Sequence, residues 1–126
     1  ELRRVFDNYK GSGVEISSVV ATGGIPLKDP MLMQILADTL NMPVSCLEST
    51  EATALGSAVY GAAAAGLYPS VAEASQRMKQ PVAKTYSPVP ENTLAYAELY
   101  REYCKLYDYF AKGENKVMEY LHDLEV

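Results

Sequence analysis

The sequence has few of the residues that build metal sites or disulfide frameworks. Its only histidine is His122, and its two cysteines, Cys46 and Cys104, lie far apart in the chain. Neither cysteine has a second Cys or His at a metal-ligand spacing. We therefore expect two packing thiols, a surface histidine and no metal site.

The sequence also lacks long apolar runs and a signal peptide. No run approaches the ~20 residues that a membrane helix needs, and the stretch from Gly61 to Gly66 is mostly alanine, as in a tightly packed helix. These absences predict a cytoplasmic protein without a membrane partner.

Clustered positive charge is missing as well. The chain has 11 Lys and Arg against 16 Asp and Glu, a formal net charge of -5, and only Arg3 and Arg4 are adjacent. Nucleic acids and anionic membranes bind proteins through clustered basic side chains. The charge pattern therefore excludes both as general partners.

The chain has 126 residues, enough for one domain with a real core. No repeat, linker or low-complexity segment divides it, so we expect a single domain over residues 1–126. It has no initiator methionine, and an apolar helical pattern begins at Leu2 without an N-cap. We interpret it as a domain of a longer protein.

Helix and strand patterns alternate in the first half of the chain. Asp29 and Pro30 are typical of a helix start, and Asn41 of a helix end. Leu32, Ile35, Leu36 and Leu40 form the apolar face expected for this helix. The predicted elements are a helix ending near residue 10, a strand Val14–Thr22, this helix, a strand Pro43–Leu47, and a helix capped by Ser49 or Thr50 that runs to about Ala65 and packs closely on the sheet.

The second half is predicted to be mainly helical. Ser70 and Glu73 form a capping box for a helix through Met78, and residues 80–91, with three prolines, predict an extended crossing. Asn92 is expected to cap a long helix that breaks at Gly113 and resumes from Glu114 to Leu124. Four tyrosines follow one stripe of that helix and predict a core or interdomain face: Tyr96, Tyr100, Tyr103 and Tyr107. The fold class is therefore α/β, helix-rich, with a long C-terminal helix.

The candidate binding site consists of the first strand, the Gly23-Gly24 pair and the helix that follows. Glycines at the carboxyl end of a strand let a ligand approach the backbone, and free amides at the start of a helix favour anions. Nucleotides bind in this way in α/β proteins. A glycine pair here also fits a simple tight turn, so the pattern alone leaves both readings open.

A wider set of residues resembles the C-terminal signature of FGGY-family carbohydrate kinases. It comprises a glycine-rich turn, a helix with Gln and Ala-Asp, a short Pro-Val strand and a helix with Glu and Ala-Leu-Gly. The matching residues are Ala21-Thr22-Gly23-Gly24, Lys28, Gln34, Ala37-Asp38, Pro43-Val44, Glu51 and Ala54-Leu55-Gly56-Ser57-Ala58. The resemblance covers about Val19 to Ala65 with its spacing kept.

This resemblance implies part of the C-terminal lobe of an actin-like ATPase (ribonuclease H-like) fold, the nucleotide side of a two-lobed kinase. Such enzymes bind ATP and Mg²⁺ in the cleft and transfer the γ-phosphoryl group to a sugar held mainly by the N-terminal lobe. The family's phosphate loop and its aspartate base lie upstream, and no residue here matches them. The chain is thus expected to hold ATP or ADP in part and to be inactive alone.

Within the family, the sequence Lys28-Asp29-Pro30 and the tyrosine-rich tail most resemble those of L-ribulokinases. These enzymes convert L-ribulose to L-ribulose 5-phosphate in L-arabinose catabolism. Two alternatives stay open: a kinase for xylulose, gluconate, glycerol or another sugar or polyol, and a non-catalytic actin-like module that binds nucleotide.

The resemblance assigns adenosine binding to Gly23, Gly24 and Lys28. It assigns no catalytic residue and no metal ligand to this chain. Ile25 stands where the family has a third glycine, which puts the detailed contacts of the loop in question. Asp38 is expected to be a structural carboxylate that ties its helix to a neighbouring loop, and Glu51 to suit the helix dipole.

The apolar residues of the opening helix and the tyrosine stripe also predict self-association. Leu2, Val5 and Phe6 provide an apolar surface next to the start of the chain. Exposed apolar patches of a few hundred Å² are usually covered. We expect a symmetric homodimer of the isolated chain; the alternative is that these residues form its own core.

Overall fold

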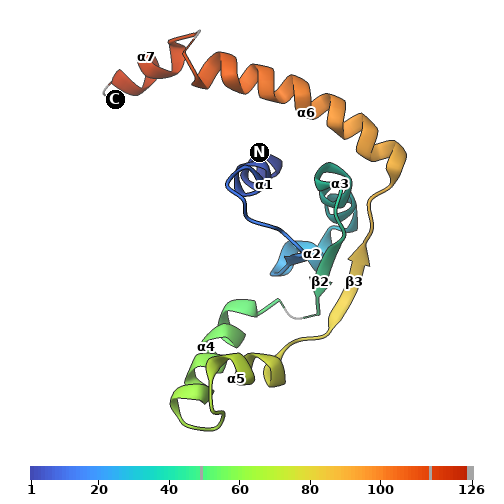
Figure 1. Ribbon diagram of the computed structural model, residues 1–126, viewed down its shortest axis with the longest axis vertical. Helices are drawn as coiled ribbons and strands as arrows, with labels where there is room; N and C mark the ends of the chain where they lie inside the picture. The colour runs from blue at the N-terminus through green and yellow to red at the C-terminus, as the bar shows by residue number, and fades with distance from the viewer. Residues whose placement is uncertain (49, 114, 125–126) are drawn as a thin grey trace. The chain divides into compact units, whose positions relative to one another are not determined.

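The computed structural model describes residues 1–48, 50–113 and 115–124. It divides into two compact units, Glu1–Pro88 and Val89–Val126. The described residues of the first unit form α1 (Leu2–Gly11), β1 (Val19–Ala21), α2 (Gly24–Lys28), α3 (Pro30–Leu40), β2 (Val44–Leu47), α4 (Ala52–Ala64), α5 (Val71–Met78) and β3 (Val82–Tyr86) (Figure 1). Those of the second unit form α6 (Pro90–Ala111) and α7 (Val117–Asp123).

A three-stranded sheet with the order β1-β2-β3 organises the first unit. β1 and β2 are parallel, with Val19 opposite Val44, whereas β2 and β3 are antiparallel, with Val44 opposite Tyr86. β3 lies within residues 80–91, which were predicted as an extended crossing segment. β1 is shorter than predicted, because residues 14–18 are not in the sheet.

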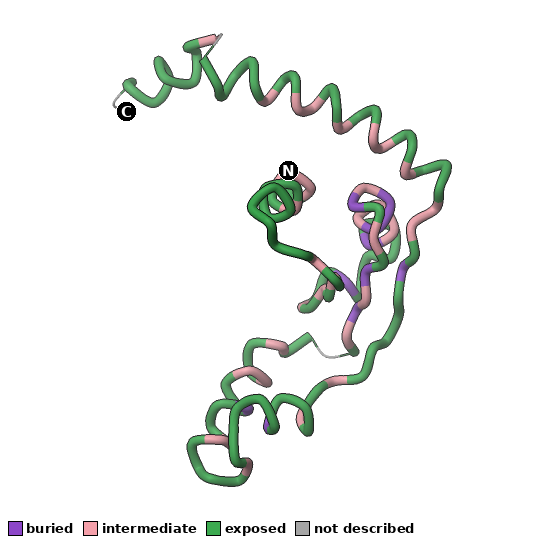
Figure 2. Tube along the Cα trace, in the orientation of Figure 1, coloured by how far each residue is buried: buried purple, intermediate pink, exposed green. Residues whose placement is uncertain are grey.

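The core of the first unit lies between α3 and the sheet, where Figure 2 shows the buried residues. It consists of Met33, Ala37, Val44, Cys46 and Tyr86. The predicted apolar face of α3 was partly wrong. Met33, Ala37 and Leu40 are buried, but Leu32 is 42% exposed, because the sheet contacts the side of the helix next to the predicted one.

The predicted ends of α3 are confirmed. The Asp29 side chain accepts a hydrogen bond from the Leu32 amide at 2.9 Å, and Pro30 occupies the first turn. Asn41 ends the helix in the left-handed conformation, with φ 51°. The Ser70 hydroxyl likewise caps α5, accepting from the Glu73 amide at 3.1 Å. These caps act within three residues of sequence, which is why the sequence reveals them.

Two predicted caps differ from the structure. α4 has Glu51 at its N-cap, and Thr50 instead donates its hydroxyl hydrogen to the Glu51 carboxylate at 3.1 Å; Ser49 lies outside the described residues. α6 begins at Pro90, before Asn92, since proline at the first position has a preset helical φ. The break at Gly113, with φ 109°, is confirmed, although α7 begins only at Val117; Glu114 lies outside the described residues.

α4 was predicted to pack closely on the sheet, but its main neighbour is α5. Val59 of α4 and Ala74 of α5 are buried. A groove of about 500 Å³ is lined by Val20 and Leu47 of the sheet and by residues of α4 and α5. The small side chains Ala54 and Ala58 are exposed. The alanine-rich surface of α4 is therefore at least partly exposed to solvent in this chain.

Candidate nucleotide-binding loop

The parallel pairing of β1 and β2 places two loops at one edge of the sheet. β1 ends at Ala21 and β2 at Leu47, and Ala21 lies opposite Cys46 in the register. Gly23-Gly24 follow the first strand and Glu51 follows the second. The carboxyl ends of parallel strands are where α/β proteins commonly bind nucleotides. The sheet thus brings the glycine pair and the start of α4 to this edge.

Gly23 has a backbone conformation that favours glycine, with φ 97° and ψ -169°. Gly24, the first residue of α2, does not have a positive φ. A Cβ added at either glycine would meet no atom within 4 Å. The space beside both residues is therefore open, as close approach of a ligand to the backbone requires.

Lys28 is the last residue of α2 and is exposed. Ile25, which stands where the resembling family has a glycine, is 61% exposed on the same short helix. Pro26 is buried and anchors α2 to the unit. The three predicted adenosine residues thus lie within one anchored turn and helix, and their contact with nucleotide remains a prediction.

Asp38 is buried, with 1% of its surface exposed, and connects to a distant segment through Gln34. The Gln34 amide donates to the Asp38 carboxylate at 2.8 Å and to the Ser87 carbonyl at 2.9 Å. Ser87 directly follows β3. Gln34 therefore ties α3 to the end of the third strand, and Asp38 holds the Gln34 amide in place. This arrangement agrees with the structural role predicted for Asp38.

Cys46 lies in the middle of β2 and is 1% exposed. Burial raises the pKa of its thiol, and the nearby Lys84 ammonium acts in the opposite direction. Lys84 also lies 4.4 Å from the centre of the Tyr86 ring. Cys46 and Cys104 are both free thiols, and Cys46 is a core residue as expected.

The described residues contain neither a metal-binding cluster nor a membrane-spanning helix. No group of three or more His, Cys, Asp or Glu side chains among them is placed to hold a metal ion. None of the described helices has the length and apolar character to cross a bilayer.

Residues 1–65 match the model of the C-terminal domain of the FGGY family of carbohydrate kinases. The chain belongs to this family. It is 42% identical over 123 residues to a ribulokinase of Geobacillus thermodenitrificans (strain NG80-2). That match covers 94% of this chain but 22% of the relative, so the chain spans about a fifth of the relative's length.

Two solved structures share its fold. A ligand-bound xylulose kinase from Lactobacillus acidophilus has 26% identity and a TM-score of 0.65 over 76% of this chain and 19% of its own. A gluconate kinase from the same organism has 24% identity and a TM-score of 0.66 over 77% and 19%. The predicted fold class is confirmed: an α/β part of the actin-like ATPase fold of FGGY kinases.

The match to the ribulokinase extends beyond the match to the family model, into the C-terminal half of the chain. The family model ends at residue 65, whereas the match to the ribulokinase covers 123 residues and so includes most of the chain beyond that point. The tyrosine-rich tail from which the sequence predicted a ribulokinase therefore belongs to the aligned region.

Proposed function

We propose that this chain is the C-terminal, nucleotide-side domain of an ATP-dependent L-ribulokinase. The full enzyme transfers the γ-phosphoryl group of ATP to a hydroxyl group of L-ribulose, giving L-ribulose 5-phosphate and ADP in L-arabinose catabolism in the cytoplasm. The observation that carries the proposal is 42% identity to a ribulokinase over 94% of the chain, including the tail beyond the family model.

In this proposal the chain binds the adenosine part of ATP. Gly23 and Gly24 offer an open backbone at the sheet edge, and Lys28 provides an exposed ammonium group one helical turn away. Holding the donor nucleotide in line with the acceptor is most of what a phosphoryl-transfer enzyme does. The chain's contribution is therefore positioning.

Mg²⁺ neutralises charge on the phosphates when it is bound in such kinases. The described residues contain no group of three carboxylates or imidazoles that would hold it. We therefore assign the metal ligands, the general base and the sugar site to the remainder of the enzyme.

Phosphorylation assays of the full-length protein test the proposal. We expect turnover with L-ribulose to exceed that with D-xylulose, gluconate and glycerol. Preference for D-xylulose or gluconate would support the second candidate, which the likeness to xylulose and gluconate kinases favours. ATP binding without transfer to any sugar would indicate a non-catalytic nucleotide-binding module.

A further inference from the structure

Ile25 is a large apolar side chain exposed beside the proposed nucleotide-binding loop. It is the second residue of α2 and is 61% exposed. Single exposed aliphatic side chains are ordinary in folded proteins, so exposure by itself assigns no role to Ile25. Its position does, because the open backbone of Gly24 and the ammonium group of Lys28 belong to the same short helix.

The geometry of α2 places Gly24, Ile25 and Lys28 on one side of the helix. The Ile25 carbonyl accepts a hydrogen bond from the amide four residues later at 2.9 Å, as in an α-helix. Successive residues are then about 100° apart around the axis, so that Lys28 falls between Gly24 and Ile25. Pro26 and Leu27 fall on the other side, and Pro26 is buried. The helix is therefore anchored opposite the side that carries Ile25.

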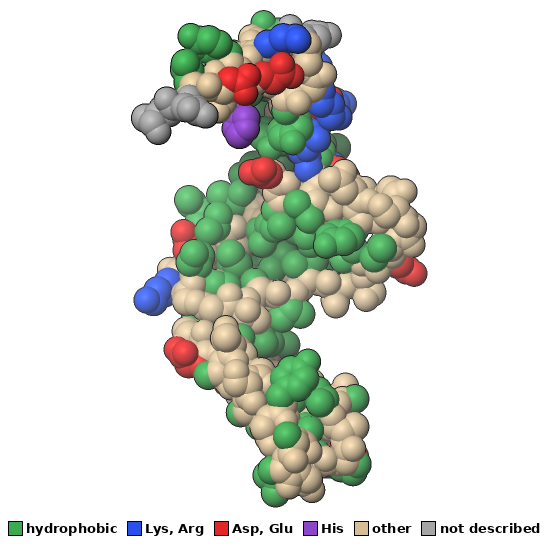
Figure 3. All heavy atoms as spheres, turned by 90° about the vertical axis from the view of Figure 1, so that its left-hand side faces the viewer, with side chains coloured by type: hydrophobic (Ala, Val, Ile, Leu, Met, Phe, Trp, Pro, Cys, Tyr) green, Lys and Arg blue, Asp and Glu red, His purple; other side chains and the backbone are tan. Residues whose placement is uncertain are grey.

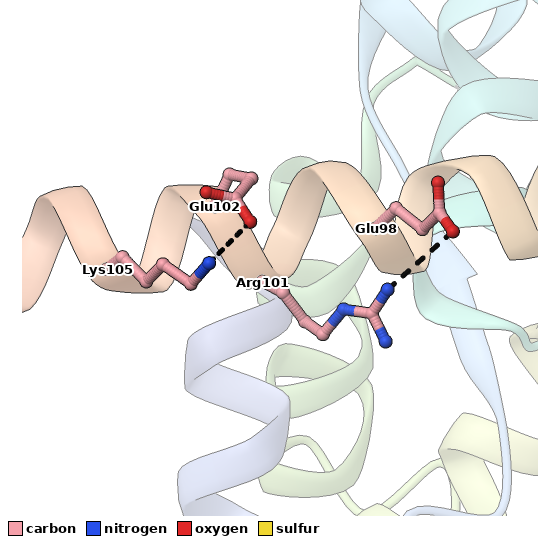
Figure 4. Close-up of polar contacts among 4 residues, drawn as sticks. All are labelled: Glu98, Arg101, Glu102 and Lys105. Carbon is pink, nitrogen blue, oxygen red and sulfur yellow. Dashed lines mark hydrogen bonds and ion pairs between the residues drawn. The ribbon is translucent and has the colours of Figure 1, made fainter.

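The Lys28 ammonium group is available to a ligand, unlike several cations elsewhere in the chain. On α6, Arg101 pairs with Glu98 at 3.7 Å. Lys105 pairs with Glu102 on the same helix at 2.7 Å, and Figure 4 shows both pairs. Lys28 forms no ion pair with another residue of the described ranges 1–48, 50–113 and 115–124. Its charge can therefore act on a polar or anionic group that binds beside α2.

A flat ring that approaches the Gly24 backbone comes next to the Ile25 side chain. A Cβ added at Gly24 would meet no protein atom within 4 Å, so the approach is open. The Cα atoms of adjacent residues are only about 3.8 Å apart. Covering the face of a base with an aliphatic side chain removes apolar surface from water, which is favourable. One side of α2 thus combines an open backbone, an apolar contact and a cation, which suits the base and the polar groups of a nucleotide.

We propose that the Ile25 side chain packs against one face of the adenine ring of ATP and favours purine over pyrimidine nucleotides. A purine ring covers more of the side chain than a pyrimidine ring does, and the gain grows with the apolar area removed from water. This inference rests on the proposed nucleotide site. It concerns this chain in particular, because the family signature has a glycine where Ile25 stands.

Inhibition of the full-length enzyme by nucleosides and by tripolyphosphate, each measured against varied ATP, tests the role of Ile25. Ile25→Ala should raise the inhibition constant of adenosine about fivefold and that of cytidine by less, because the smaller ring loses less contact. Inorganic tripolyphosphate has no base, so its constant should stay within about twofold. Ile25→Val keeps more of the apolar surface and should raise the adenosine constant only about twofold.

Leu27→Ala is the matched control. Leu27 is an apolar side chain of the same helix, 39% exposed, on the side away from Ile25. Its replacement should leave the adenosine constant within about twofold, and neither substitution should change the KM for the sugar. Circular dichroism and thermal unfolding verify the fold of each variant, which an exposed side chain such as Ile25 should affect little.

Three results would overturn the proposal. They are an unchanged adenosine constant in Ile25→Ala, equal effects of the Ile25 and Leu27 substitutions, or a tripolyphosphate constant that rises as much as that of adenosine. Gly24→Val in the same enzyme separates this inference from the proposed function. If Gly24→Val raises the KM for ATP while Ile25→Ala changes nothing, the loop binds nucleotide and the role of Ile25 is wrong. If neither substitution affects ATP, the proposed nucleotide site is wrong as well.

Discussion

Gly23 and Gly24 are glycines for different physical reasons. Gly23 has φ 97°, a conformation that side chains with a Cβ rarely adopt, whereas Gly24 has no positive φ. The left-handed conformation of the turn therefore lies at Gly23 and not at Gly24. A substitution at Gly24 therefore tests ligand approach with little backbone strain.

In the full-length enzyme, Gly24→Val is expected to raise the KM for ATP roughly tenfold, about 1.4 kcal/mol of binding, with little change in the KM for sugar. The valine side chain occupies open space beside the backbone, where a Cβ meets no protein atom within 4 Å. Steady-state kinetics in both substrates measure the effect. Gly11→Val, at the end of α1, is the control, and equal changes in both KM values would make the loop structural.

The two thiols are expected to differ in reactivity. Cys46 is buried and burial raises the pKa of its thiol, while Cys104 is half-buried. Since thiolates are the reactive form, an alkylating reagent should modify Cys104 first, with Cys46 modified only after unfolding. Mass mapping of the labelled peptides over time decides this, and equally fast labelling would contradict the buried position.

The same shift makes stability depend on pH. The pKa of Cys46 is higher in the folded than in the unfolded chain, so its contribution is complete below the unfolded value of about 8.5. It is lost as the pH rises from that value through the higher pKa of the folded state. Urea unfolding between pH 7 and 10 should show this loss, and Cys46→Ala should reduce the slope. If the free energy of unfolding falls with pH as steeply in the Cys46→Ala variant, other groups cause the loss of stability.

At the scale of elements, α3 is held to the end of β3 by one buried polar link. Gln34 bonds both Asp38 and the Ser87 carbonyl. Asp38→Ala removes a buried acceptor and should lower the free energy of unfolding by about 1–3 kcal/mol. Asp38→Asn keeps the size and one oxygen acceptor, so its loss should be smaller. Urea titration of the chain measures both, and no loss with alanine would show that the link is dispensable.

At the scale of the molecule, the chain spans about a fifth of the length of the ribulokinase to which it is similar. Figure 3 shows hydrophobic side chains gathered on one face of its first unit. Exposed apolar residues of this unit include Leu2, Val5 and Val20. These patches are typical of surfaces that pack against other protein.

The purified 126-residue chain is expected to fold but to show no sugar-dependent ATP turnover. We propose that its residues supply only one side of the ATP site, so its affinity for ATP is also expected to be low. Coupled ADP assays and calorimetry measure these two properties. Turnover by the chain, or tight ATP binding, would show that its site is more complete than proposed.

Local chemistry determined the features that the sequence revealed. The caps at Asp29 and Ser70, the left-handed Asn41 and the break at Gly113 each depend on backbone groups within a few residues. The glycine pair after the first strand was visible for the same reason. The family resemblance added the actin-like ATPase fold to the α/β class, and the comparisons confirmed it.

Contacts between distant residues decided the rest. β3 is a strand because Tyr86 pairs with Val44, and this partner is far away in sequence. The buried side of α3 depends on where the sheet lies, so Met33 is in the core and Leu32 is exposed. α4 packs on α5 because the turn after Gly66 folds the chain back. Hydrogen-bond ladders and packing across such distances leave no local signal, because each strand or helix face fits several neighbours until the chain is folded.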